Sequence, residues 1–234
     1  MIISQLYKPS IQKLLLHIGH IGTSKKIYPM QSFSINLDFC PKDLMNDPDH
    51  TCHYCYVKHS NLWRFWKHIL DENTKLIQND PLWVTAISFY INKVGRNNQF
   101  RFWVAGEFKD YKMFKKVMQV VKNCPNCTFW IPTTKHDLVF RYIEEFGKPK
   151  NASINLSYTF IHNPIPKKLI RKAVKYDLKI THAVVDDKEV NCHANLNESG
   201  NCEYCSNCID VPGKENRVIN YKLKHNGKNL EEVI

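Results

Sequence analysis

QFRFWVAGEFKDYKMFKKVMQVVKNCPNCTFWIPTT, residues 99–134, contains the strand, helix and strand of one β-α-β unit. Its first and last segments are rich in aromatic and β-branched residues, which is typical of strands. Between them, apolar residues recur on one helical face: Met113, Phe114, Val117, Met118 and Val121. This order predicts two parallel strands joined by a right-handed crossover.

The same alternation continues on both sides of this unit. Further segments have the spacing of strands (32–39, 152–160 and 179–186) or of helices (60–78, 81–94, 137–147 and 167–178). We therefore expect an α/β fold with about five to six β-α units, arranged as a partial (β/α) barrel or as an open parallel sheet.

Composition narrows the class of protein. The chain has 234 residues with 43% hydrophobic residues, which is enough for a sizeable core. It contains no run of 18 or more apolar residues, and its first 20 residues are too weakly apolar for a signal peptide. We expect a cytoplasmic protein that does not contact a membrane.

Nine cysteines in such a chain point to metal binding. A reducing compartment disfavours disulfides, and an odd number of cysteines cannot pair completely. The cysteines form three groups: Cys40, Cys52 and Cys55; Cys124 and Cys127; and Cys192, Cys202, Cys205 and Cys208.

The last group has the spacing C-x9-C-x2-C-x2-C in a polar, Asn-rich segment. Four closely spaced thiolates can form a complete site for zinc or for an iron-sulfur cluster. The apolar pattern stops near Asp186. We therefore predict an α/β core over residues 1–186 and a cysteine-rich metal-binding extension over residues 187–234.

The first group follows the first predicted strand, and in parallel α/β folds ligands bind at the carboxyl ends of strands. Gly106 and Glu107 end the next strand, and Thr133 and Thr134 end the one after it. Three thiols leave one coordination position open, as reactive metal centres do. We expect these residues to line one edge of the sheet.

This arrangement resembles the radical S-adenosylmethionine superfamily, whose motif C-x3-C-x-aromatic-C follows the first strand. Residues 52–55, CHYC, match its second half, with Tyr54 as the aromatic residue. Eleven residues separate Cys40 from Cys52 where the motif has three, and a loop of that length closes at modest entropic cost. VAGEF (residues 104–108) partly matches the Gly-Gly-Glu stretch of that superfamily.

The resemblance implies an enzyme in which Cys40, Cys52 and Cys55 hold a 4Fe-4S cluster. The cluster would cleave S-adenosylmethionine reductively, with electrons from a flavodoxin or ferredoxin and with an auxiliary 4Fe-4S cluster in the tail. It also implies cofactor contacts from Tyr54, Gly106, Glu107 and Thr133. In this reading Glu107 binds the ammonium group of the cofactor, and Gly106 allows its close approach.

The order of short motifs is also similar to that of the phage and plasmid gene-product-88 family. These motifs are CP at 40, CY at 55, GEF at 106, TFWIPTTK at 128 and CEYCSNC at 202. The resemblance covers roughly residues 32–210 and implies a phage or plasmid protein, but it indicates no substrate.

Other interpretations of the same residues remain open. The first three cysteines could bind zinc together with His50, His53 or His59. Glu107 could form an ion pair with Arg101 or a lysine. Two further features have structural explanations: Cys124 and Cys127 could be half-buried thiols at a helix end, and His182 could be a core-edge residue.

Charge gives a clue to partners. The chain has 33 Lys and Arg against 22 Asp and Glu, for a net charge of +11. Basic residues concentrate in the helix predicted at 167–178 and near the carboxyl terminus. Such a surface can bind nucleic acid or a phosphorylated substrate. The competing hypothesis is therefore a non-enzymatic nucleic-acid-binding protein that zinc or a cluster stabilises.

Overall fold

Strands from most of the chain form a single seven-stranded sheet. The structure is a computed structural model, and it describes residues 12–22, 30–59, 63–93, 98–184, 208, 218–222, 224–225 and 228–229. The strands of the sheet are β1 (Ile21–Gly22), β2 (Gln31–Phe33), β3 (Gln99–Phe102), β4 (Thr128–Thr133), β5 (Ala152–Tyr158), β6 (Lys179–Val184) and β7 (Val218–Lys222). They lie side by side in sequence order, with β1 antiparallel to β2 and all other neighbours parallel.

Helices connect the parallel strands. They are α2 (Tyr56–His59), α3 (Trp63–Asn79), α4 (Trp83–Lys93), α5 (Tyr111–Asn123), α6 (His136–Phe146) and α7 (Lys167–Lys175). Two short 3-10 helices, η1 (Leu37–Phe39) and η2 (Leu44–Asn46), lie between β2 and α2, and β8 (Lys224–His225) pairs with β9 (Lys228–Asn229).

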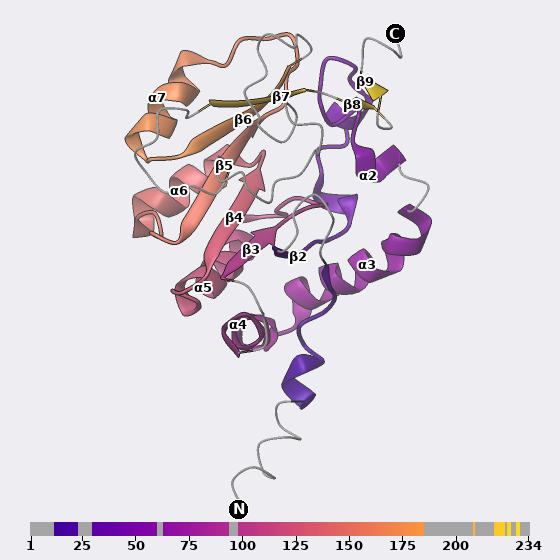
Figure 1. Cartoon of the computed structure of the whole chain (residues 1–234), viewed down its shortest axis with the longest axis vertical. Coiled ribbons are helices and arrows are strands. Elements are labelled where there is room, and N and C mark those ends of the chain that lie inside the picture. Colours follow the sequence, from indigo (N-terminus) through magenta and orange to yellow (C-terminus); the bar gives the residue numbers. More distant parts are fainter. Residues whose placement is uncertain are drawn as a thin grey trace, which may run out of the picture.

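The helices α3 to α7 cover the same face of the sheet. Right-handed crossovers between strands that neighbour one another in sequence order place these connecting helices on one side. One apolar core accordingly joins alternate residues of the strands, such as Phe102, Phe129 and Ile154, to residues of the helices, such as Phe114 and Val139. Figure 1 shows α5, α6 and α7 following one another along the sheet.

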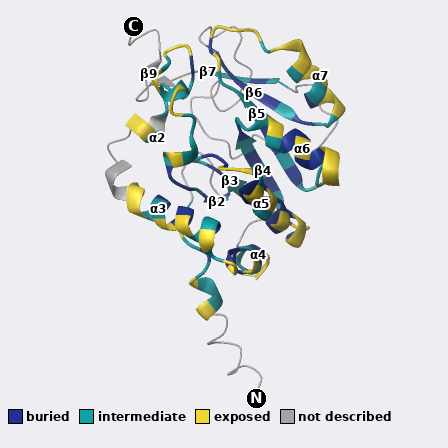
Figure 2. Ribbon diagram, turned by 180° about the vertical axis from the view of Figure 1, so that it is seen from behind, coloured by how far each residue is buried: buried dark blue, intermediate teal, exposed yellow. Residues whose placement is uncertain are grey.

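Helix boundaries follow from local chemistry. Asp110 caps α5 by accepting a hydrogen bond from the amide of Met113 at 2.9 Å. Gly147 ends α6 with φ of 76°, a conformation that favours glycine. The helices are dark blue toward the sheet and yellow toward solvent in Figure 2, as the 3.6-residue spacing of their apolar side chains predicts.

The predicted α/β class is confirmed, with a sheet that is mostly parallel. The described pairings run from β1 to β7 in an open row, and none of them joins the two edges. Two strands are shorter than predicted. The strand predicted at 32–39 ends at Phe33, and the strand predicted over 99–108 ends at Phe102, because Trp103 has the left-handed φ of 64°.

Strand β7 is an element that the sequence reasoning missed. Its residues lie in the predicted extension, yet Ile180 pairs with Val218 and Val184 pairs with Lys222, so this part of the chain adds a strand to the main sheet. The boundary near Asp186 stays a prediction, because residues 185–207 and 209–217 lie outside the described part of the chain. No helix within the described residues is both long and apolar enough to cross a membrane.

Candidate functional site

The predicted site residues lie at the carboxyl ends of β2, β3 and β4. Thr133 is the last residue of β4, Glu107 follows β3 in the chain, and Cys40 follows β2 and η1. The Thr133 hydroxyl donates a 2.7 Å hydrogen bond to Glu107 Oε1. Burial raises the pKa of the Cys40 thiol, and the nearby charge of Glu107 adds to this effect. These three residues therefore gather at one edge of the sheet, as predicted.

Glu107 is the polar centre of this edge. Its side chain is buried, and its carboxylate accepts four hydrogen bonds. Oε1 accepts from the Phe108 amide (2.8 Å) and the Thr133 hydroxyl (2.7 Å). Oε2 accepts from the Thr134 amide (2.7 Å) and hydroxyl (2.8 Å). The carboxylate thereby joins the loop after β3 to the end of β4.

Burial and hydrogen bonding act on Glu107 in opposite directions. Burial raises the pKa of the carboxyl group, and the four donors partly lower it. The alternative of an ion pair with Arg101 is not what the structure shows. The Arg101 guanidinium lies 3.9 Å from the ring centre of Trp130, and no ion pair within the described residues involves Glu107.

Gly106 allows two loops to interlock. It has φ of 90°, and a Cβ atom at this position would lie 2.7 Å from the Ile35 carbonyl oxygen and 2.8 Å from that of Asn36. The Ile35 amide also donates to the Ala105 carbonyl at 3.2 Å. A glycine is therefore required here by the segment that leads to Cys40, independently of any ligand.

Cys40 lies close enough to Cys52 and Cys55 to interact with them electrostatically, although they come from two separate segments. Burial raises the pKa of Cys40 to about 12, and the charges of Glu107, Cys55 and Cys52 add to the shift. Burial also raises the pKa of Cys52 to about 12, with contributions from Cys55 and Glu107. All three are free thiols. Within the described residues, no group of three or more His, Cys, Asp or Glu side chains is arranged to hold a metal ion.

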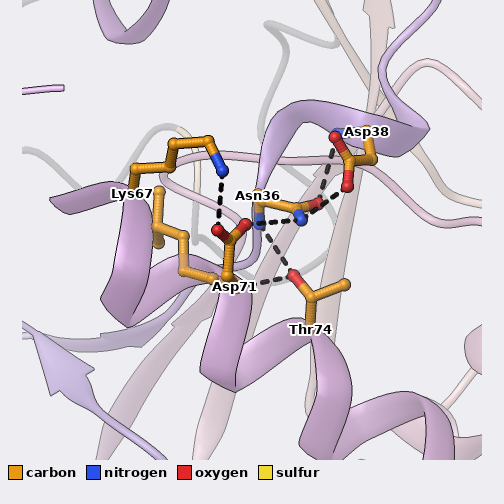
Figure 3. A network of polar contacts seen from close by, with 6 residues as sticks. Asn36, Asp38, Lys67, Asp71 and Thr74 are labelled. Atoms are coloured by element: carbon orange, nitrogen blue, oxygen red, sulfur yellow. Dashed lines mark hydrogen bonds and ion pairs between the residues drawn. The ribbon is translucent and has the colours of Figure 1, made fainter. Parts of the chain in front are cut away.

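A polar network holds the segment before Cys40 against α3 (Figure 3). The buried Asn36 side chain donates to Asp38 at 2.7 Å and to Asp71 of α3 at 2.9 Å. The backbone amide of Asn36 donates to the Thr74 hydroxyl at 2.9 Å. Lys67 forms a 2.7 Å ion pair with Asp71. These bonds give the turn before Cys40 a fixed support on α3.

The loop that carries Cys52 and Cys55 is held on another side, by the segment after β5. The Thr51 amide donates to the Thr159 carbonyl at 2.8 Å, and the Ile161 amide donates to the Asp49 carbonyl at 3.0 Å. His50 and Phe160 form an antiparallel bridge, and their rings are 5.0 Å apart in an edge-to-face arrangement. The loop is thus tied to β5 by backbone pairing.

His50 uses both ring nitrogens within the protein. Its Nε2 hydrogen-bonds the Thr159 hydroxyl, and its Nδ1 accepts from the Cys52 amide at 3.4 Å. The side chain is fully buried, and burial lowers the pKa of the ring. His59 Nε2 contacts the His53 carbonyl at 2.8 Å. His50 could bind zinc only if one of its two hydrogen bonds broke. His59 could bind zinc through Nε2 only if that nitrogen lost its contact with the His53 carbonyl.

Tyr54 belongs to a small apolar cluster, whereas Glu107 and Thr133 hydrogen-bond each other. It packs against Ile161 and Ala183, and its ring lies edge-to-face against His53 with 4.8 Å between ring centres. These contacts assign Tyr54 to the small apolar cluster that supports the cysteine loop. Its role in binding a cofactor stays a prediction.

Cys124 and Cys127 belong to the apolar core rather than to the edge. Both are buried, and burial raises the pKa of Cys124 to about 11 and that of Cys127 to about 12. Asn151 donates to the carbonyls of Val121, Cys124 and Cys127 at 3.0–3.1 Å and so closes the turn that they form. These contacts agree with a structural role, and the thiols are buried rather than half-buried.

The predicted tail site falls mostly outside the described residues, which include Cys208 but not Cys192, Cys202 or Cys205. The carbonyl of Cys208 accepts a 2.7 Å hydrogen bond from Ser153 of β5. Ser153 alternates with the core residues Ala152 and Ile154, so its side chain points to the face of the sheet that the helices leave uncovered. Cys208 therefore lies over that face.

Three histidines that sequence reasoning did not combine support the end of β5. His136 Nε2 hydrogen-bonds the Ser157 carbonyl at 3.0 Å, and His182 Nε2 hydrogen-bonds that of Phe160 at 3.0 Å. His50 contacts Thr159 between them. The residues come from α6, β6 and the cysteine loop, so only the strand order reveals that they contact the same segment. His182 is a core-edge histidine, as the structural interpretation expected.

A comparison with protein families places the chain in one of them. No curated protein and no solved structure matches the chain. The family described as Gene product 88 matches residues 12–225, which is most of the chain and includes β1 to β7 and every predicted site residue. The chain therefore belongs to the Gene product 88 family.

Proposed function

We propose that this protein is an iron-sulfur enzyme of the radical S-adenosylmethionine type, with its cluster at Cys40, Cys52 and Cys55. The observation that carries the proposal is that Cys40 and Cys52, from two segments, lie close enough to Cys55 and to the buried Glu107 carboxylate for these charges to add to the effect of burial on their pKa values. In parallel α/β folds this edge is where ligands bind.

The chemistry of the thiols supports a cationic ligand. With a pKa of about 12, Cys40 and Cys52 are protonated near neutral pH, because burial and neighbouring negative charge oppose their ionisation. A bound metal supplies the positive charge that stabilises thiolates, and its binding releases protons. A four-iron cluster binds each thiolate through a different iron, so its ligand sulfurs lie farther apart than those around a single metal ion.

When bound, such a cluster supplies the electron that cleaves S-adenosylmethionine reductively. This chain would hold the cluster through its three thiols, while the segments around Asn36 and Thr159 fix the loops that carry them. Glu107 would accept a hydrogen bond from the cofactor's ammonium group at Oε2, which in this structure accepts from the Thr134 amide and hydroxyl. The four tail cysteines would hold the proposed auxiliary cluster, and a flavodoxin or ferredoxin is the proposed reductant.

The decisive assay measures 5′-deoxyadenosine after dithionite is added, without air, to the iron-loaded protein and S-adenosylmethionine. We expect product from the wild type and none from Cys52→Ser. Cys124→Ser is the matched control, because its thiol is buried in the core away from the edge, and it should keep the activity. An iron-loaded wild-type protein that forms no 5′-deoxyadenosine contradicts the proposed reaction.

A basic, non-enzymatic nucleic-acid-binding protein is the second candidate, and helix α7 favours it. The nine residues of α7 include five basic residues and no acidic residue. Lys167, Lys168 and Arg171 are exposed, and no ion pair within the described residues involves them. Phosphate binding by such a surface weakens steeply as salt rises.

The two candidates predict different results. For the second, a labelled oligonucleotide should bind with an affinity that falls between 50 and about 200 mM salt and that drops when Lys168 and Arg171 become glutamine. Metal analysis should then find stoichiometric zinc or a cluster, and S-adenosylmethionine should remain uncleaved. An oligonucleotide that does not bind at low salt contradicts the second candidate.

A further inference from the structure

We propose that His50 is a positioning residue that sets the direction of the Cys52 thiol. Its ring accepts the hydrogen bond of the Cys52 amide and holds the Thr159 hydroxyl. The inference rests on the proposed function only in treating Cys52 as a ligand, because the placement of Cys52 is a property of the metal-free protein as well.

The hydrogen bonds assign each ring nitrogen a role. The amide of Cys52 is a donor, so Nδ1 is the acceptor and carries no proton. Nε2 carries the proton and donates it to the Thr159 hydroxyl oxygen. One imidazole thus joins the backbone of the cysteine loop to the side chain of a residue 109 positions later in the chain.

The bond between residues 50 and 52 has the form of an Asx turn, in which a side-chain acceptor binds the amide two residues later. Such a turn fixes the backbone of the intervening residue, Thr51. It therefore determines where Cys52 begins and which way its side chain leaves the loop. The hydrogen bond from the Thr51 backbone amide to the Thr159 carbonyl holds the same residue on its other side.

The partner of His50 is itself rigidly placed. Thr159 follows β5, and the flanking carbonyls of Ser157 and Phe160 are held by His136 and His182 at 3.0 Å each. The position of the segment at the end of β5 therefore does not depend on His50 alone. Loss of the His50 ring should release the cysteine loop while the end of β5 keeps two of its three histidine supports.

The two nitrogens can be tested separately with two substitutions. Asparagine at position 50 provides a side-chain oxygen near the place of Nδ1, so H50N keeps the turn to Cys52 and loses the bond to Thr159. Glutamine provides a nitrogen near the place of Nε2, so H50Q keeps the bond to Thr159 and loses the turn. H162N is the matched control, because His162 is an exposed histidine just beyond the same segment.

The readout is the alkylation rate of each cysteine in metal-free protein, measured with iodoacetamide and peptide mass spectrometry. In H50Q, Cys52 should react about threefold to tenfold faster than in wild type, which corresponds to the loss of one neutral hydrogen bond. H50N and H162N should stay within about twofold of wild type. Cys40 should be unchanged in all variants, because another segment carries it.

Buried thiols separate positioning from general destabilisation. Cys124 and Cys127 lie in the core, so faster alkylation of both in H50Q would show global opening and would overturn the proposal. Equal Cys52 rates in H50Q and wild type, or a faster rate in H50N than in H50Q, would also overturn it. If the wild-type protein binds no iron, the proposed function fails, while the Cys52 rates still decide whether His50 positions the thiol.

Discussion

Replacing Glu107 by glutamine tests the centre of the site. Each carboxylate oxygen accepts from one backbone amide, Oε1 from Phe108 and Oε2 from Thr134. A glutamine side chain has one oxygen and one NH2 group, so in either orientation its NH2 faces a backbone N–H that cannot rotate away. One buried amide therefore loses its acceptor.

The expected cost follows from that unpaired group. A buried donor without a partner costs about 1–3 kcal/mol, and relief from burying a charge places the result toward the lower end. In a chain of this size, each kcal/mol lowers Tm by roughly 2–4 °C. We expect Glu107→Gln to lower Tm by a few degrees in metal-free protein, measured by calorimetry or circular dichroism.

A second substitution shows whether the effect passes through the predicted bonds. Thr133→Val removes the hydroxyl that donates to Oε1, whereas Thr133→Ser keeps it as the matched control. The double variant of Glu107 and Thr133 should show a coupling energy of at least about 0.5 kcal/mol. An unchanged or raised Tm for Glu107→Gln, or additive effects with Thr133→Val, would refute this account of the carboxylate.

Three other perturbations have defined outcomes. Gly106→Ala should destabilise the fold by more than about 2 kcal/mol in chemical denaturation, because the new Cβ would lie 2.7 Å from the Ile35 carbonyl oxygen. Gly147→Ala is the control and should cost less, because it adds backbone strain at φ of 76° without a clash. Asn36→Asp should lower Tm more than Asn36→Ala, since it places a third carboxylate beside two others, and equal losses would contradict the network. The pKa of the Cys40 thiol is raised from an ordinary 9.0 to about 12, so the metal-free protein should lose stability as pH rises through that interval. Cys40→Ser should make this loss less steep in unfolding measured at several pH values. An equally steep loss in the variant would contradict the assignment.

The sequence predicted the fold through periodicity. Helices α3 to α7 and strands β4 to β6 lie where apolar spacing placed them, because long amphipathic segments carry a strong signal. It failed at β2, which ends at Phe33, and at β3, which ends before the left-handed backbone of Trp103. It also missed β7, a five-residue strand whose neighbour in the sheet is distant in sequence.

The sequence predicted which residues lie together at the carboxyl edge of the sheet, and only partly which contacts they make. The carboxyl-edge rule correctly brought Cys40, Glu107 and Thr133 together. Residue type alone suggested a ligand or an ion pair for Glu107, whereas its described partners are hydroxyls and backbone amides. The role of His50 depends on Thr159, and such a long-range bond has no signature in sequence spacing.

The most direct test of the central claim is the iron and sulfide content of protein purified or reconstituted without air. Two four-iron clusters predict about eight atoms of each per chain, and replacement of Cys40, Cys52 and Cys55 together by serine should remove about half. The same replacement of Cys124 and Cys127 should leave the count unchanged, because these thiols lie in the core. A triple variant that keeps the full iron content, or a wild-type protein that holds only zinc, would contradict the claim.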